Sequence, residues 1–173
     1  IARAIVINPT MVIADEPVAA LDVSIQAQIL NLLKDLQEQN NLTYIFVSHN
    51  MAVIRYISDR IAVMYAGKLV ELGPKSQLLS QPRHPYTEML LAAVPRAADR
   101  RTGHRALSTG EPPDLAHLPS GCVFRTRCRY ASERCAEEEP QLREIEPGYH
   151  VSCHFAEELA LQGVATRVKA LGQ

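Results

Sequence analysis

Met11-Val12-Ile13-Ala14-Asp15-Glu16-Pro17 is the stretch that decides the fold, because its four apolar residues end in two adjacent carboxylates. An apolar run of this length that stops at charge predicts a buried strand of a parallel sheet, ending where ligands bind. Neighbouring strand residues point to opposite faces, so we expect Asp15 and Glu16 to have different roles. One carboxylate can hold Mg²⁺ through its water shell while the other polarises an attacking water. A solvated acidic turn is the ordinary alternative.

A helix and a second strand follow this stretch. Asp22 is a good N-cap for a helix over residues 23–39, whose apolar side chains recur at three- and four-residue spacings. Residues 43–47 are rich in β-branched and aromatic side chains and predict a second buried strand. His49 comes directly after that strand, and if the two strands are parallel it lies at the same sheet edge as the acidic pair.

The middle of the chain predicts a hairpin and a last helix. Residues 60–65 and 68–72, joined by Ala66-Gly67, have the pattern of a β-hairpin, and Gly73-Pro74 is expected to end it. A helix is expected over residues 87–94. Beyond it the composition becomes polar and irregular, which is typical of a linker.

Composition and charge exclude several classes of protein. The 173 residues have a net charge of −1, with Lys and Arg scattered along the chain, so there is no nucleic-acid footprint. No apolar run approaches the ~20 residues that a membrane-spanning helix needs, and no secretory signal opens the chain. We therefore expect a cytoplasmic protein whose role at a membrane is exerted through a partner.

Asp15-Glu16-Pro17, then Ala20-Leu21-Asp22, then Ser48-His49 resemble, in order and spacing, the motifs of the ATP-binding subunits of ABC transporters. The resemblance implies an α/β fold, the P-loop NTPase (RecA-like) core, with ATP and Mg²⁺ as cofactors. It makes Asp15 the Walker B aspartate, Glu16 the catalytic glutamate and His49 the switch histidine that contacts the γ-phosphate. It places Asp22 in the D-loop, at the interface with a second ATPase subunit.

The family places its phosphate loop and signature motif before the Walker B strand, and neither is found here. The chain begins at Ile1. We expect it to be the C-terminal part of a longer ATPase. Without the backbone N–H groups and the lysine of a phosphate loop, we expect the fragment alone to be inactive.

The four cysteines are Cys122, Cys128, Cys135 and Cys153, separated by five, six and seventeen residues. A reducing cytoplasm disfavours two disulfides. Structural zinc usually shows cysteines paired two to four residues apart, and that pairing is absent from the sequence. An iron–sulfur cluster accepts looser spacing. The spacing leaves zinc, iron–sulfur and unligated thiols all open.

A second resemblance concerns this cysteine segment. The stretch Pro119 to Cys128, then Glu138-Glu139-Pro140 and His150 to His154, looks like the C-terminal extension of oligopeptide and dipeptide importer ATPases, as does His84-Pro85-Tyr86-Thr87. The resemblance implies a [4Fe–4S] cluster with Cys122, Cys128, Cys135 and Cys153 as its ligands. Zn²⁺ is the alternative, with His150 or His154 as a substitute ligand. For so small a module, the default role of the metal group is to stabilise the fold.

These resemblances imply a domain order and a function. Residues 1–95 are expected to be the C-terminal part of the nucleotide-binding domain and 96–118 a linker. A small irregular four-cysteine module is expected over 119–155, with a tail over 156–173. The expected function is ATP hydrolysis that powers import of di- and oligopeptides, or related nickel-type substrates.

The expected partners are a second ABC ATPase subunit and transmembrane permease subunits, with a substrate-binding protein engaged indirectly and no nucleic acid. The expected location is peripheral, at the cytoplasmic face of the plasma membrane. The alternative is a metal- or redox-sensing regulatory module attached to an ABC ATPase. A non-transport ABC ATPase fits poorly, because such proteins lack this cysteine extension.

Overall fold

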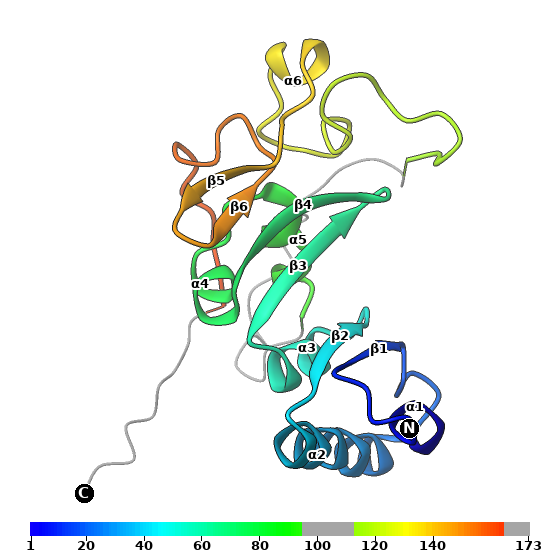
Figure 1. The fold of residues 1–173 in the computed structure, drawn as a ribbon. Helices are drawn as coiled ribbons and strands as arrows, with labels where there is room; N and C mark the ends of the chain where they lie inside the picture. The colour runs from blue at the N-terminus through cyan, green and yellow to red at the C-terminus, as the bar shows by residue number, and fades with distance from the viewer. Residues whose placement is uncertain (95–112, 165–173) are drawn as a thin grey trace, which may run out of the picture. The chain divides into compact units, whose positions relative to one another are not determined.

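The structure is a computed structural model that describes residues 1–94 and 113–164 (Figure 1). It divides into two compact units, of which the first ends at Ser58 and the second begins at Asp59. Each unit has its own sheet, two-stranded in the first and four-stranded in the second. No helix among the described residues is both long and apolar enough to cross a membrane.

The first unit is built on a pair of parallel strands. Strand β1 (Met11–Asp15) pairs in parallel with β2 (Thr43–Val47), which confirms the expected direction of the two strands. The connection between them is α2 (Val23–Asn40), while α1 (Ala2–Ile5) precedes β1 and α3 (Met51–Ile57) follows β2. The carboxyl ends of both strands therefore meet at one edge of the sheet.

Helix α2 begins and ends where the sequence predicts. The Oδ1 atom of Asp22 accepts hydrogen bonds from the backbone N–H groups of Ser24 and Ile25, each at 3.0 Å. This side chain satisfies two of the N–H groups that a helix start leaves without partners. The helix ends at Asn41, whose φ of 51° is left-handed, a conformation that Asn tolerates.

Among the described residues, one face of the two-stranded sheet is covered, so the strands are half-buried and not buried as predicted. The side chains of Tyr44 and Phe46 pack against a core formed by the residues Val18, Leu30, Leu33, Val53 and Ile57. On the other face, Met11 is 50% exposed and Ile13 is 66% exposed. Burial alternates along both strands because α2 and α3 supply apolar side chains to one face alone.

The second unit begins with the predicted hairpin. Strands β3 (Arg60–Tyr65) and β4 (Lys68–Pro74) pair antiparallel, and both residues of the turn, Ala66 and Gly67, have positive φ. Two left-handed residues suit the twist of a two-residue hairpin turn. Gly73-Pro74 was expected to end the hairpin, but strand β4 continues through both residues. At Gly73 a side chain would collide with the ring of Tyr149, so the glycine serves close packing instead.

The cysteine segment is less irregular than expected, because it adds two strands to the hairpin. Strands β5 (Arg143–Glu146) and β6 (Tyr149–Val151) form a second hairpin, and β6 pairs antiparallel with β4. The strand order is β3-β4-β6-β5 (Figure 1). Tyr149 and Val151 are completely buried by this pairing. The segment also holds a short helix, α6 (Arg134–Glu137).

Two helices complete the second unit. They are α4 (Lys75–Ser80) and α5 (Pro85–Ala92), the latter starting two residues before its predicted position with a proline in its first turn. The backbone N–H of Val164 donates to the carbonyl of Leu79 at 2.7 Å, so the end of the described chain is tied to α4. Of the predicted linker over 96–118, residues 96–112 lie outside the described residues, and of the predicted tail over 156–173, residues 165–173 do so. The expected division of domains follows sequence motifs rather than contacts, and it stays a prediction.

Candidate functional site

The first candidate site lies at the carboxyl ends of β1 and β2. Glu16 follows β1 and donates its backbone N–H to the carbonyl of Val47 at 3.0 Å. Its φ of 45° is left-handed, which is uncommon for a residue other than glycine and frequent at functional sites. The Oε1 atom of Glu16 accepts the backbone N–H of His49 at 3.0 Å and lies 2.7 Å from His49 Nδ1. The structure therefore brings together two residues that are 33 positions apart in the sequence.

The hydrogen bond from the His49 side chain holds the pKa of Glu16 below its usual range, since it outweighs the opposing effect of desolvation. The carboxylate is thus ionised near neutral pH. Where Nδ1 carries the hydrogen that faces Glu16, the other ring nitrogen of a neutral His49 is an acceptor. The side chain of His49 is 81% exposed, so this second nitrogen is open to solvent.

The remaining two residues of the predicted site lie beside this pair along the chain. Asp15 is the last residue of β1, paired in register with Val47, and is exposed on the uncovered face of the sheet. Asp22 uses its carboxylate as the N-cap of α2. The structure therefore places Asp15, Glu16 and His49 at one sheet edge, and Asp22 at the start of the helix that leaves it.

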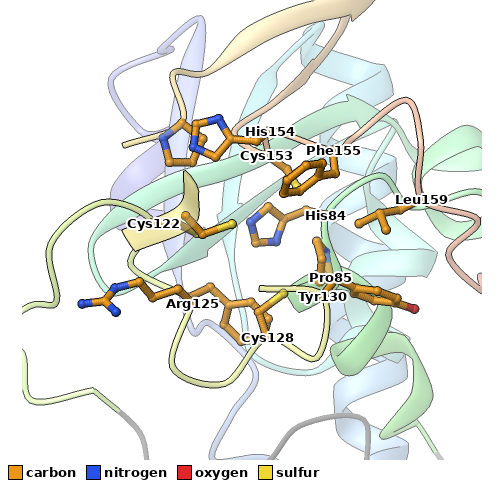
Figure 2. A pocket seen from close by; sticks show the side chains of 13 residues that line it. His84, Pro85, Cys122, Arg125, Cys128, Tyr130, Cys153, His154, Phe155 and Leu159 are labelled. Carbon is orange, nitrogen blue, oxygen red and sulfur yellow. The ribbon is translucent and has the colours of Figure 1, made fainter. Parts of the chain in front are cut away.

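The second candidate site is a pocket in the second unit that all four cysteines line. Cys122 and Cys128 come from the loop before α6, Cys135 from α6 itself, and Cys153 from the segment after β6. All four are free thiols. Figure 2 shows how the side chains converge from these segments; the other lining residues include His84, Arg125, Tyr130, His154, Phe155 and Leu159.

A glycine allows two of the cysteine segments to approach each other. The backbone N–H of Cys122 donates to the carbonyl of Cys135 at 2.8 Å. Gly121, which precedes Cys122, has a φ of 65°, and a side chain there would collide with the backbone carbonyls of Cys135 and Ala136. Gly121 is thus a residue of the site that the cysteine spacing did not identify.

Burial makes ionisation of the cysteines unfavourable. Together with a smaller effect of the neighbouring cysteines, it raises the pKa of Cys122, that of Cys128 to about 11 and that of Cys153 to about 12. Opposing this, each of the three sulfurs has a backbone N–H two residues later that lowers its pKa; these belong to Phe124, Tyr130 and Phe155. The pocket therefore provides backbone hydrogen-bond donors to three of its four sulfurs.

The pocket fits a metal group because of the side-chain and backbone atoms that line it. Four thiols and three backbone N–H groups aimed at sulfur are the chemistry that a metal–thiolate site requires. Among the described residues, no set of three or more His, Cys, Asp or Glu side chains is already placed to hold one metal ion.

His84 is a pocket residue whose position the sequence did not predict. It is 1% exposed and lies at the N-terminus of α5, where its Nδ1 atom accepts the backbone N–H of Tyr86 at 3.1 Å. Burial lowers the pKa of His84 to about 3, so the ring is neutral. Its ring packs against that of Phe124, with the centroids 5.8 Å apart.

Two buried carboxylates hold the walls of the pocket together. Glu71 is 0% exposed and accepts hydrogen bonds from the backbone N–H of Arg83 at 2.6 Å and from the hydroxyl of Tyr149. Glu88 on α5 is 2% exposed and accepts from Arg129 and from the backbone N–H of Gln162. Since unpartnered buried carboxylates are costly, these contacts fix the loops that carry the pocket residues.

Residues 70–135 match the family described as the oligopeptide/dipeptide transporter C-terminal region. This match covers the second hairpin strand, α4, α5 and the first three cysteines.

Similar proteins cover nearly all of the chain. The oligopeptide transport ATP-binding protein AppF of Bacillus subtilis is 51% identical over 157 residues, which is 90% of this chain and 48% of that protein. A putative peptide import ATP-binding protein of Brucella ovis is 49% identical over 88% of this chain and 48% of its own. The di/tripeptide transport ATP-binding protein DppF of Pseudomonas aeruginosa is 48% identical over 91% of this chain and 49% of its own. The chain spans about half the length of the curated relatives it matches.

Proposed function

Because these comparisons confirm the resemblance to the ATP-binding subunits of oligopeptide and dipeptide ABC importers, we propose that the chain is the C-terminal part of such a subunit. In the whole protein it takes part in the ATP hydrolysis that powers peptide import. The observation that carries this proposal is the pairing of Glu16 with His49 at the carboxyl ends of two parallel strands. Open α/β sheets bind ligands at this edge.

Each residue of this edge then has a distinct role. Asp15 holds Mg²⁺ through its water shell, and Glu16, kept ionised by His49, orients and polarises the attacking water. A phosphate oxygen needs a hydrogen-bond donor. His49, which lies beside Glu16, supplies such a contact to the γ-phosphate. Asp22 orders the start of α2 beside the interface with the second ATPase subunit.

The uncovered face of the two-stranded sheet supports the view that more protein packs here. Met11, Ile13, Ile45 and Val47 are 47–66% exposed on that face. Apolar surface of this kind is stabilising only when it is buried. In the whole subunit we infer that the remaining half of the protein covers this face and supplies the phosphate loop.

The partners and the location follow from the same relatives. A second ATPase subunit completes each nucleotide site, permease subunits carry the peptide across the membrane, and a substrate-binding protein delivers it. The subunit lies peripherally at the cytoplasmic face of the membrane. These assignments rest on what the relatives are named for, which is oligopeptide, peptide and di/tripeptide transport.

For the cysteine pocket we propose a [4Fe–4S] cluster with Cys122, Cys128, Cys135 and Cys153 as ligands, in preference to Zn²⁺. Convergence of the four side chains on one pocket and the N–H donors beside three sulfurs support it. When bound, the cluster supplies cationic iron that stabilises the four thiolates. The protein purified without oxygen is expected to contain about four iron and four sulfide per chain. One zinc and no sulfide would contradict the cluster.

The ATPase proposal is tested with Glu16→Gln in the full-length protein. Gln keeps the shape of the side chain but cannot act as a base, so ATP hydrolysis should fall at least about a hundredfold while ATP binding is retained. Glu38→Gln on the exposed side of α2 is the matched control. Normal turnover by Glu16→Gln would refute the role of Glu16.

A further inference from the structure

The imidazole of His84 is a buried polar side chain at the wall of the cysteine pocket. It lines the same pocket as all four cysteines, and Figure 2 shows it between Cys122, Cys128 and Cys153. With 1% exposure it has almost no contact with bulk water. A polar group in such a position is costly unless it has a partner.

The hydrogen bonds of the ring define its tautomer. Nδ1 accepts the backbone N–H of Tyr86 at 3.1 Å, so it carries no hydrogen of its own in the neutral ring. The hydrogen must then be on Nε2, which is a donor. The hydrogen bonds of His84 within residues 1–94 and 113–164 are made by its backbone N–H and by Nδ1, and none of them uses this Nε2–H.

The ring is also held firmly in place. The backbone N–H of His84 donates to Oε2 of the buried Glu71 at 3.2 Å, and one face of the ring packs on Phe124. The donor is therefore preorganised toward the pocket rather than free to find another partner. Preorganised donors of this kind are typical of groups that bind an electron-rich ligand.

We propose that His84 donates its Nε2–H as a hydrogen bond to a sulfur of the iron–sulfur group that the four cysteines hold. This inference rests on the proposed [4Fe–4S] ligation. Hydrogen bonds to sulfur stabilise the more negative, reduced state of a cluster and so raise its reduction potential. His84 is thus a residue that positions and tunes the cluster without ligating it.

Two substitutions of His84 separate this role from a structural one. His84→Asn keeps an oxygen that can cap α5 by accepting the Tyr86 N–H, but it lacks a donor at the position of Nε2. His84→Gln is longer and can place an amide N–H near that position. His117→Asn is the control, because His117 is exposed, is not among the residues that line the pocket and pairs with Asp114.

The measurement is a redox titration of the full-length, cluster-loaded protein, followed by visible absorption and electron paramagnetic resonance. At a fixed ambient potential, His84→Asn is expected to lower the ratio of reduced to oxidised cluster about tenfold. This corresponds to a reduction potential that is ~59 mV lower for a one-electron couple. His84→Gln should lie between His84→Asn and the wild type, and His117→Asn should match the wild type. Iron and sulfide contents are measured on the same samples.

Several outcomes would overturn the proposal. An unchanged potential in His84→Asn with full iron and sulfide would do so, as would an equal shift in His117→Asn. If His84→Asn does not fold, wild-type protein containing ¹⁵N-labelled histidine decides, because the reduced cluster should show magnetic coupling to a histidine nitrogen, and its absence refutes the bond. Wild-type protein without iron and sulfide would overturn both this inference and the proposed cofactor. A cluster with an unaltered potential would overturn this inference alone.

Discussion

The backbone N–H of His84 donates to the carboxylate of Glu71, which lies on β4 and is completely buried. A strand of the hairpin thereby fixes a residue that lines the cysteine pocket. The same carboxylate accepts from the hydroxyl of Tyr149 on β6, so it links the hairpin, the start of α5 and the strand that leads to Cys153. The pocket thus depends on an acidic side chain from outside the cysteine segment.

Glu71→Gln should therefore destabilise the protein. The amide nitrogen of Gln would place a donor where the carboxylate faces donors from Arg83, His84 and Tyr149. Leaving a buried N–H without an acceptor costs ~1–3 kcal/mol, to be measured as a lower free energy of unfolding in urea. Tyr149→Phe, which removes one donor, should cost about 1 kcal/mol. The exposed Glu158→Gln is the control, and an equal effect there would contradict the role of Glu71.

Gly121→Ala is expected to damage the cysteine pocket more than a comparable glycine substitution elsewhere. The new methyl group would combine a left-handed φ with a collision against the carbonyl of Cys135. Backbone strain of this kind costs of order 1–3 kcal/mol, and the collision adds to it. The variant should unfold at lower temperature and retain less iron.

Gly148→Ala is the matched control for that substitution. Gly148 also has a positive φ, 73°, but a side chain there meets no atom within 4 Å. It should therefore show strain alone, about 1 kcal/mol, with full iron content. Equal losses of stability and iron in the two variants would show that the approach of Gly121 to Cys135 is unimportant.

The parts of the fold that could be predicted depend on local patterns. The parallel strands, the cap of α2 at Asp22 and the hairpin at Ala66-Gly67 all follow from side chains adjacent in the sequence. The pairing of β6 with β4 does not, because it joins Leu72 to His150 across a long stretch of chain. Strand β6 is also only three residues long, too short to show a period.

The residues of the two sites also divide into those that could be predicted from the sequence and those that could not. Glu16 and His49 could be paired because both follow apolar strands of a parallel sheet, whose ends meet. Glu71 and Glu88 could not be identified, since glutamate is ordinarily exposed and only the tertiary structure supplies their buried donors. His84 was singled out only as part of the stretch His84-Pro85-Tyr86-Thr87, which resembles importer ATPases. Its place at the pocket depends on how α5 packs against the cysteine loops.

The pairing of Glu16 with His49 predicts a change in titration. His49→Ala removes the hydrogen bond that lowers the pKa of Glu16, so this pKa should rise toward its ordinary value of 4.5. A carboxyl group with a lowered pKa in the folded state stabilises the fold above the unfolded-state pKa, and this contribution is lost as the pH falls through the folded-state pKa. The variant should lack that contribution, which is small because the pair is exposed.

The titration can be followed through the carboxyl ¹³C shift of Glu16. His117→Ala serves as a control, because His117 makes the same type of contact with a different carboxylate, that of Asp114. It should raise the pKa of Asp114 and leave that of Glu16 unchanged. A Glu16 pKa that does not move in His49→Ala would show that the two side chains are not hydrogen-bonded in solution.

Ile13 should behave differently in the chain alone and in the full-length protein. It lies 66% exposed on the uncovered sheet face, so Ile13→Lys should leave the unfolding free energy of the 173-residue chain within about 0.5 kcal/mol and raise its monomer fraction in sedimentation. In the full-length subunit, where we infer that this face is covered, the same substitution would bury a charge and cost several kcal/mol. Val23→Lys is the control, since Val23 is also exposed but lies at the start of α2, away from that face. Equal effects of Ile13→Lys in the two proteins would show that the rest of the subunit does not pack on β1.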